Sequence, residues 1–195
     1  AAEKFANLGN ENVKIDNGAT IGNINTVLGE TTGVVTASAT GFASVLAAGL
    51  TNATSGKVTA TVADAAATVL VAALTDAKPT DALTLTVDGT PTAAQLKLLD
   101  AKTSVEVDAS GVTAITGNAA DVKTVLAATT ITKSGSETVT VSGTVSAADA
   151  NTIAKATAGV VTATVAAGTA ASLVKALENV TTDSDALTLK VTGTA

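Results

Sequence analysis

The side chains best placed for binding in this sequence are threonines at alternate positions of strand-like segments. Alternate residues of a β-strand point to the same face, so each Thr-x-Thr pair places two hydroxyls together. Ladders of such pairs on a flat face are what ice-binding proteins use. Threonine is also a β-branched, soluble residue suited to any exposed strand, and we favour this simpler interpretation. The candidate binding face comprises Thr59, Thr61, Thr84, Thr86, Thr138, Thr140, Thr162 and Thr164.

Acidic residues in loops form a second group of candidates. Asp183 and Asp185 could hold a weakly bound Ca²⁺, because calcium takes carboxylate and other hard oxygen ligands. The same residues fit Asx turns and helix caps, which is the interpretation we favour. Asp76 with Asp81 and the loop Asp16–Gly18 are candidates of the same kind, and no cofactor other than such a calcium ion is predicted.

Residue types argue against catalysis. The chain has no His, Cys, Met, Trp or Tyr, which excludes imidazole and thiolate chemistry and His or Cys metal sites. Ser172 and Lys175 have the spacing of a nucleophile and a base. We favour the interpretation that they lie on an exposed helix face. The acidic residues are scattered. We therefore expect no enzyme activity and predict no catalytic residue.

Composition also limits the partners. The net charge is −6, arginine is absent and aromatic residues make up 1% of the chain. These features argue against a nucleic-acid partner, which would need a basic face and stacking platforms. No apolar run reaches the ~20 residues of a membrane span, so none is expected. Hydrophobic residues nevertheless make up 46%, enough for a core of Ala, Val, Leu and Ile.

Internal repeats dominate the sequence. Gly56–Leu74 (GKVTATVADAAATVLVAAL) recurs as Gly159–Leu177 (GVVTATVAAGTAASLVKAL), and Asp81–Leu85 (DALTL) recurs as Asp185–Leu189. A third copy begins at Gly33. Within this long period, most strand-like runs follow one another at spacings of about 20–26 residues. The interval from Val107 to Val141 is longer, and it holds either a longer loop or an extra short strand near Ala114–Thr116 or Ile131. They are Val13–Ile15, Val35–Ala37, Val58–Val62, Leu83–Val87, Val105–Val107, Val139–Val141, Val161–Val165 and Leu187–Val191.

Short helices are predicted between these strands. Thr92–Gln95 and Ser146–Asp149 resemble capping boxes, and Asn118–Asp121 resembles a similar cap. Apolar residues then recur at helical spacing. Glycines follow the helices at Gly33, Gly56 and Gly159, positions that suggest C-caps.

Strand–helix–strand succession favours parallel pairing. The sequence therefore predicts an α/β tandem-repeat solenoid of about eight coils, with a parallel strand ladder on one face and short helices on the other. We expect residues 1–195 to form a single solenoid segment, cut from a longer array at both ends. The predicted core consists of Val62, Leu85, Val107, Val141, Val165 and Leu189 in the sheet, with Leu70, Leu96, Val125, Ile153 and Leu173 on the helices.

Two motifs carry a resemblance to a known group of proteins. Val107–Gly117 (VDASGVTAITG) and Ser146–Ile153 (SAADANTI) resemble the tandem repeats of very large extracellular and cell-surface proteins of marine picocyanobacteria. The resemblance implies an α/β-solenoid fold, a secreted or surface location and a structural or adhesive role. Calcium-binding nonapeptides occur in that family, but no Gly-Gly-x-Gly-x-Asp run is present here.

Three functions remain open on these grounds. The first is a structural repeat segment that forms a stiff rod or fibre in a large surface or extracellular protein. The second is an adhesive or ligand-binding solenoid face for a glycan, a cell or ice. The third is a self-assembling filament subunit. The expected partners are neighbouring repeats of the same chain or copies of it, and any further ligand is unknown.

Overall fold

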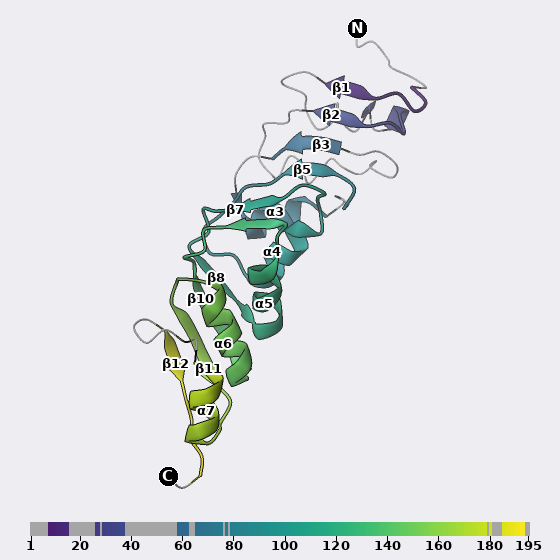
Figure 1. The fold of residues 1–195 in the computed structure, drawn as a ribbon. Helices are drawn as coiled ribbons and strands as arrows, with labels where there is room; N and C mark the ends of the chain where they lie inside the picture. The colour runs from purple at the N-terminus through teal and green to yellow at the C-terminus, as the bar shows by residue number, and fades with distance from the viewer. Residues whose placement is uncertain are drawn as a thin grey trace. The chain divides into compact units, whose positions relative to one another are not determined.

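The computed structural model describes residues 8–15, 26–27, 29–37, 58–62, 65–75, 77, 79–178, 180 and 185–193. The chain forms two compact units: unit 1 comprises residues 1–87 and 98–108, and unit 2 comprises residues 88–97 and 109–195. Both contain parallel strands and helices, so the fold is mixed α/β (Figure 1). The predicted parallel pairing is confirmed, and helices alternate with paired strands in the described residues from α3 (Ala67–Ala73) onward.

Unit 1 contains a four-stranded parallel sheet with the order β1-β2-β3-β5. Its strands are β1 (Val13–Ile15), β2 (Val35–Ala37), β3 (Val58–Thr61) and β5 (Ala82–Thr84). The register aligns Val13 with Val35, Val35 with Val58, and Ala60 with Leu83. The remaining elements up to residue 109 are β4 (Ala65–Ala66), α3 (Ala67–Ala73), β6 (Val87–Asp88), α4 (Ala93–Asp100) and β7 (Val107–Ala109).

Unit 2 contains a second four-stranded parallel sheet with the order β12-β11-β10-β8. Its strands are β8 (Ala114–Asn118), β10 (Thr138–Val145), β11 (Val161–Val165) and β12 (Ala186–Thr188). One helix connects each pair of neighbours, and Figure 1 shows the three helices on the same side of the strands. These helices are α5 (Ala119–Ala127), α6 (Ala147–Ala156) and α7 (Ala170–Ala176); β9 (Ile131–Lys133) follows α5. Both proposed extra strands, near Ala114 and Ile131, are therefore present.

Strand β11 shows how the sequence pattern builds this layer. Val161, Ala163 and Val165 are buried, whereas Thr162 and Thr164 between them are exposed. The buried valines face the helix layer, where Val125 and Ile153 are fully buried. Helices of seven to ten residues would be marginal alone, so burial against the sheet stabilises them.

The predicted core residues are confirmed as buried, with one exception. Leu189 is 45% exposed. It follows β12, the edge strand of its sheet, and no described element covers that edge. Its counterpart in the earlier repeat copy, Leu85, is fully buried. The prediction for Leu189 was wrong because burial depends on a neighbouring coil as well as on the residue type.

The C-cap interpretation of the glycines was also wrong. Neither Gly33 nor Gly159 has the left-handed φ of a glycine C-cap. Each is needed for a close backbone approach instead, since a Cβ on Gly159 would come within 2.2 Å of the carbonyl oxygen of Glu137, and one on Gly33 equally close to that of Glu11. Gly56 lies outside the described residues.

Candidate functional site

The outward face of the unit 2 sheet carries exposed threonines in two rows, which we call the threonine face. Thr116, Thr140 and Thr162 are aligned across β8, β10 and β11. Thr144, Thr164 and Thr188 are aligned across β10, β11 and β12. All six side chains are exposed.

A register shift in β10 separates the two rows. The pairing moves from Thr140 opposite Thr162 to Thr144 opposite Thr164, so two extra residues of β10 are accommodated between them. Gly143, with φ of 75°, lies in this segment, a backbone conformation that glycine adopts readily. Thr138, which precedes this shift, pairs with Ala114 of β8, so of the predicted pair Thr138 and Thr140 only Thr140 enters a threonine row.

Among the predicted threonines of unit 1, only one pair is aligned across neighbouring strands. Thr59 pairs with Ala82, and Thr61 pairs with Thr84. Thr61 and Thr84 are exposed, and Thr86 is partly exposed in a bridge to Asp108. The predicted threonines therefore lie in strands in both units, except Thr86, which forms an isolated bridge, and their alignment is interrupted by alanines.

Hydroxyl groups are what the threonine face offers to a ligand. They can donate and accept hydrogen bonds but have no charge at neutral pH and no proton-transfer role without a base. Such a surface could order water or contact sugar hydroxyls. The arrangement therefore suits binding through many weak polar contacts and contains no reactive centre.

Of the calcium candidates, Asp183, Asp76 and the loop Asp16–Gly18 lie outside the described residues. Asp185 Oδ1 accepts a hydrogen bond from the main-chain N–H of Val161 (2.9 Å), which links the start of β12 to β11. Within the described residues, no group of three or more acidic side chains is positioned to hold a metal ion. Asp185 thus has the structural role of a main-chain acceptor.

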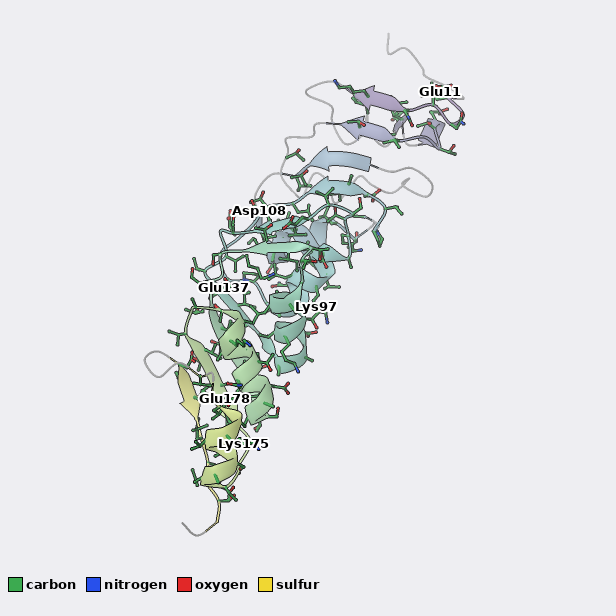
Figure 2. The ribbon with its side chains drawn as sticks, viewed as in Figure 1. Glu11, Lys97, Asp108, Glu137, Lys175 and Glu178 are labelled. Atoms are coloured by element: carbon green, nitrogen blue, oxygen red, sulfur yellow. The ribbon has the colours of Figure 1, made fainter. Side chains whose placement is uncertain are left out.

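Ser172 and Lys175 are not arranged as a nucleophile and its base. The Oγ of Ser172 donates to the carbonyl oxygen of Thr169 (2.9 Å), and Thr169 caps helix α7 through the Ser172 N–H (3.3 Å). Lys175 is exposed on the same helix (Figure 2). The expectation of an exposed helix face at Ser172 and Lys175 agrees with this geometry.

Three buried threonines, which we call the threonine brackets, were not predicted from the sequence. Thr31, Thr103 and Thr157 precede the strand-forming segments. Each Oγ1 donates to a carbonyl oxygen 20 residues earlier: Glu11 (2.6 Å), Leu83 (2.8 Å) and Glu137 (2.8 Å), respectively. Each also accepts the N–H two residues later, at Gly33 (2.9 Å), Val105 (3.1 Å) and Gly159 (3.0 Å).

A bracket satisfies polar groups of two successive turns with one hydroxyl. Because buried main-chain groups without partners are costly, this arrangement fixes one turn against the turn before it. The sequence signal was the recurring Thr-x-Gly at Thr31–Gly33 and Thr157–Gly159, the same glycines whose positions suggested C-caps. Thr54–Gly56 has the same pattern and lies outside the described residues.

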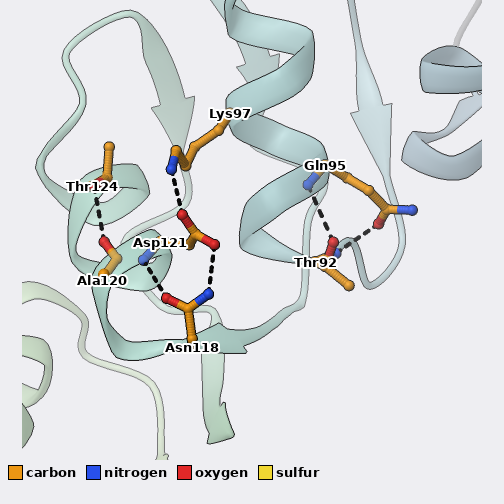
Figure 3. Close-up of polar contacts among 7 residues, drawn as sticks. All are labelled: Thr92, Gln95, Lys97, Asn118, Ala120, Asp121 and Thr124. Atoms are coloured by element: carbon orange, nitrogen blue, oxygen red, sulfur yellow. Dashed lines mark hydrogen bonds and ion pairs between the residues drawn. The ribbon is translucent and has the colours of Figure 1, made fainter.

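The helix starts agree closely with prediction. Thr92 and Gln95 form a reciprocal capping box, with N–H···O distances of 2.8 and 3.2 Å (Figure 3). Asn118 accepts from the Asp121 N–H (2.9 Å), and Ser146 accepts from the Asp149 N–H (3.1 Å). These caps satisfy donors that a helix N-terminus leaves without intrahelical partners.

Ion pairs connect successive helices at the same caps, a feature that the sequence pattern did not predict. Lys97 on α4 pairs with Asp121 on α5, and Lys123 on α5 pairs with Asp149 on α6 (Figure 3 shows the first). The ammonium group of Lys97 and the side chain of Asn118 lower the pKa of Asp121. Lys123 and Ser146 likewise lower the pKa of Asp149. Both carboxylates are therefore held in the charged form.

A groove of about 600 Å³ lies beside β12 and α7 at the edge of unit 2. We call it the end groove. Its lining is mostly apolar and includes Leu173, Val174, Leu177, Leu187, Leu189 and Val191. Asp185 also contributes to the lining, and its Oδ2 is buried without a hydrogen-bond partner in the described part of the chain.

No helix among the described residues is long and apolar enough to cross a membrane. Comparison of the chain with protein-family models, curated proteins and solved structures finds no match.

Proposed function

We propose that this chain is a structural repeat segment in which short strand–helix coils stack into an α/β solenoid, forming a stiff rod or fibre. The threonine brackets carry this proposal. Each one bonds a turn to the turn 20 residues before it, so stabilising contacts run between nearest neighbours, as a solenoid requires. Parallel pairing in chain order and the ion pairs between α5 and its neighbours support the same arrangement.

Duplication of one coil tests the stacked architecture. Residues 139–160 would be repeated after Val160, where the register already aligns Val139 with Val161. We expect the longer chain to remain folded and its maximum dimension, measured by small-angle X-ray scattering, to increase by about 4.8 Å, one strand spacing. A Gly/Ser insertion of equal length at the same point is the control. Loss of folded structure in the duplicated chain would reject the solenoid.

The proposed setting is a large extracellular or cell-surface protein, supported by the resemblance of Val107–Gly117 and Ser146–Ile153 to such repeats. The intact mass of the native protein from its source, with negative-stain imaging, tests this setting. A mass many times 18.7 kDa together with thin rods is expected. A native mass near 18.7 kDa would contradict it.

A binding role for the threonine face is the second candidate. Alignment of exposed Thr116, Thr140 and Thr162 on neighbouring strands favours it. A double variant, Thr140→Lys with Thr162→Lys, would disrupt the row, and Thr152→Lys on helix α6 is the matched control. The parent chain would be assayed for glycan binding and for inhibition of ice recrystallisation. An activity that the double variant loses and the Thr152→Lys control keeps would support this role. Inactivity of the parent chain in both assays would reject it.

A further inference from the structure

The end groove exposes side chains of a kind that the same fold buries elsewhere. Leu189 is 45% exposed, Val191 58% and Val174 76%. Large aliphatic side chains grouped around a cavity favour burial against another apolar surface. The groove therefore has the properties of a contact surface.

The internal repeat provides a reference for this surface. Leu173, Leu177, Leu187, Leu189 and Val191 correspond in the repeated sequence to Leu70, Leu74, Leu83, Leu85 and Val87. Every one of the five earlier residues is buried to within 1%. Leu173 is buried in the later copy too, whereas Leu189 and Val191 are exposed there. Because the residue types are the same in the two copies, we attribute this difference to what covers the two positions.

In unit 1, the covering segment is the end of α4 with the chain that follows it. Leu99 lies beside Val71 of helix α3. Thr103 Oγ1 then donates to the Leu83 carbonyl (2.8 Å) and accepts the Leu83 N–H (2.9 Å). Finally the Asp108 N–H donates to the Leu85 carbonyl (2.9 Å). The helix end, the bracket threonine and the segment at Asp108 thus each contact the earlier coil, at α3, at Leu83 and at Leu85 respectively.

The groove also contains a polar group without a partner. Asp185 occupies the repeat position of Asp81, whose main-chain carbonyl accepts from the N–H (2.7 Å) and the Oγ (2.9 Å) of Ser104. At Asp185 it is a side-chain atom, Oδ2, that is buried and has no hydrogen-bond partner in the part of the chain described. A buried acceptor without a donor is unfavourable, which adds a polar component to the apolar one.

From these correspondences we propose that the end groove binds a polypeptide segment with the pattern of Thr92–Ala109. That pattern is a capped helix with leucines three residues apart (Leu96 and Leu99), a bracket threonine (Thr103) and an extended segment parallel to the residues that follow β12. In unit 1 the equivalent segment bonds to Leu85 and bridges Thr86 through Asp108. The recognition is strand addition combined with helix packing. This inference rests on the proposed function, because it names the partner that a stacked coil accepts at its open edge.

A synthetic peptide of residues 90–110 tests the proposal with the full chain. Methyl NMR signals of Leu187, Leu189 and Val191 should shift saturably as the peptide is added. A peptide with Leu96→Asp, Leu99→Asp and Thr103→Val is the matched control and should produce no such shifts. In the protein, Leu189→Asp with Val191→Asp should weaken binding about tenfold or more, because the burial of both side chains is lost. Both residues are more than two-fifths exposed, so the variant should keep the far-UV circular-dichroism spectrum and the cooperative melting of the parent chain.

Three results would overturn the proposal. The first is the absence of saturable shifts at the groove. The second is shifts at Leu70 and Leu85, which would mean that the peptide displaces its own counterpart in unit 1. The third is shifts at Leu189 that depend on protein concentration without peptide, which would assign the groove to a second copy of the chain. If the coil-duplicated chain is longer but the peptide does not bind, the solenoid proposal is retained and only the proposed partner of the end groove is rejected.

Discussion

The backbone of Gly159 lies directly against the carbonyl group of Glu137, so that a Cβ at position 159 would come within 2.2 Å of the Glu137 oxygen. The N–H of Gly159 meanwhile donates to Thr157, whose hydroxyl donates to the same carbonyl oxygen. Glycine and threonine thus form one structural motif, in which glycine permits the close approach of the two backbones and threonine satisfies their polar groups. The same motif recurs in unit 1 at Gly33, Thr31 and Glu11.

Substitution of Gly159 by alanine should strongly destabilise unit 2. The added methyl group meets main-chain atoms that cannot rotate away, so β10 and β11 must separate, at a cost of about 3 kcal/mol or more. Gly143→Asn is the control, because a Cβ at that position would meet no atom within 4 Å and asparagine tolerates positive φ; its cost should stay below about 1 kcal/mol. Urea unfolding followed by far-UV circular dichroism measures both. Equal effects would contradict the close-approach role.

Replacement of Thr157 by valine tests the bracket itself. Valine keeps the shape but leaves the Glu137 carbonyl and the Gly159 N–H without their partner, so the expected loss is about 1–3 kcal/mol. Thr162→Val on the exposed face of β11 removes a hydroxyl without this consequence and should change the stability by less than about 0.5 kcal/mol. Faster amide exchange at Gly159 in the Thr157 variant alone would locate the effect. Similar losses for both variants would show that the bracket hydroxyl has no special role.

Local signals in the sequence predicted local structure well. The Thr92, Asn118 and Ser146 caps are where the side-chain pattern placed them, because capping depends on residues within one turn. Strand alternation likewise predicted that Val161 and Val165 are buried and that Thr162 is exposed.

Features that depend on a neighbouring coil were not predictable in this way. Leu189 has the same local sequence as Leu85, and only the covering segment distinguishes their burial. The role of Gly159 depends on Glu137, 22 residues away, and the register shift in β10 is what places Thr144 opposite Thr164. Of the six residues of the threonine face, the sequence pattern named Thr140, Thr162 and Thr164, whereas the other three required the strand register: Thr116, Thr144 and Thr188.

The ion pair between Lys97 and Asp121 predicts a specific pH response. Lys97 is the main cause of the lowered pKa of Asp121, so Lys97→Met should raise that pKa toward its ordinary value of about 3.9. Because the folded pKa is the lower one, the stabilisation is present above the unfolded pKa and is lost as the pH falls through the folded value. Carbon-13 NMR titration of the carboxyl groups measures the shift. Lys155→Met is the control, since Lys155 lies in the last turn of α6; an unchanged Asp121 pKa in the Lys97 variant would contradict the assignment.

Truncation of Leu85 and of Leu189 compares the same repeat position with and without its covering coil. Leu85→Ala should cost about 2–5 kcal/mol, because it opens a cavity in a fully buried site. Leu189→Ala should cost less than about 1 kcal/mol, because a side chain that is 45% exposed loses little burial. Urea unfolding of the two single variants, followed by circular dichroism, provides the comparison. A large loss at Leu189 would mean that the groove is already covered in solution, and the peptide of residues 90–110 would then find no open site.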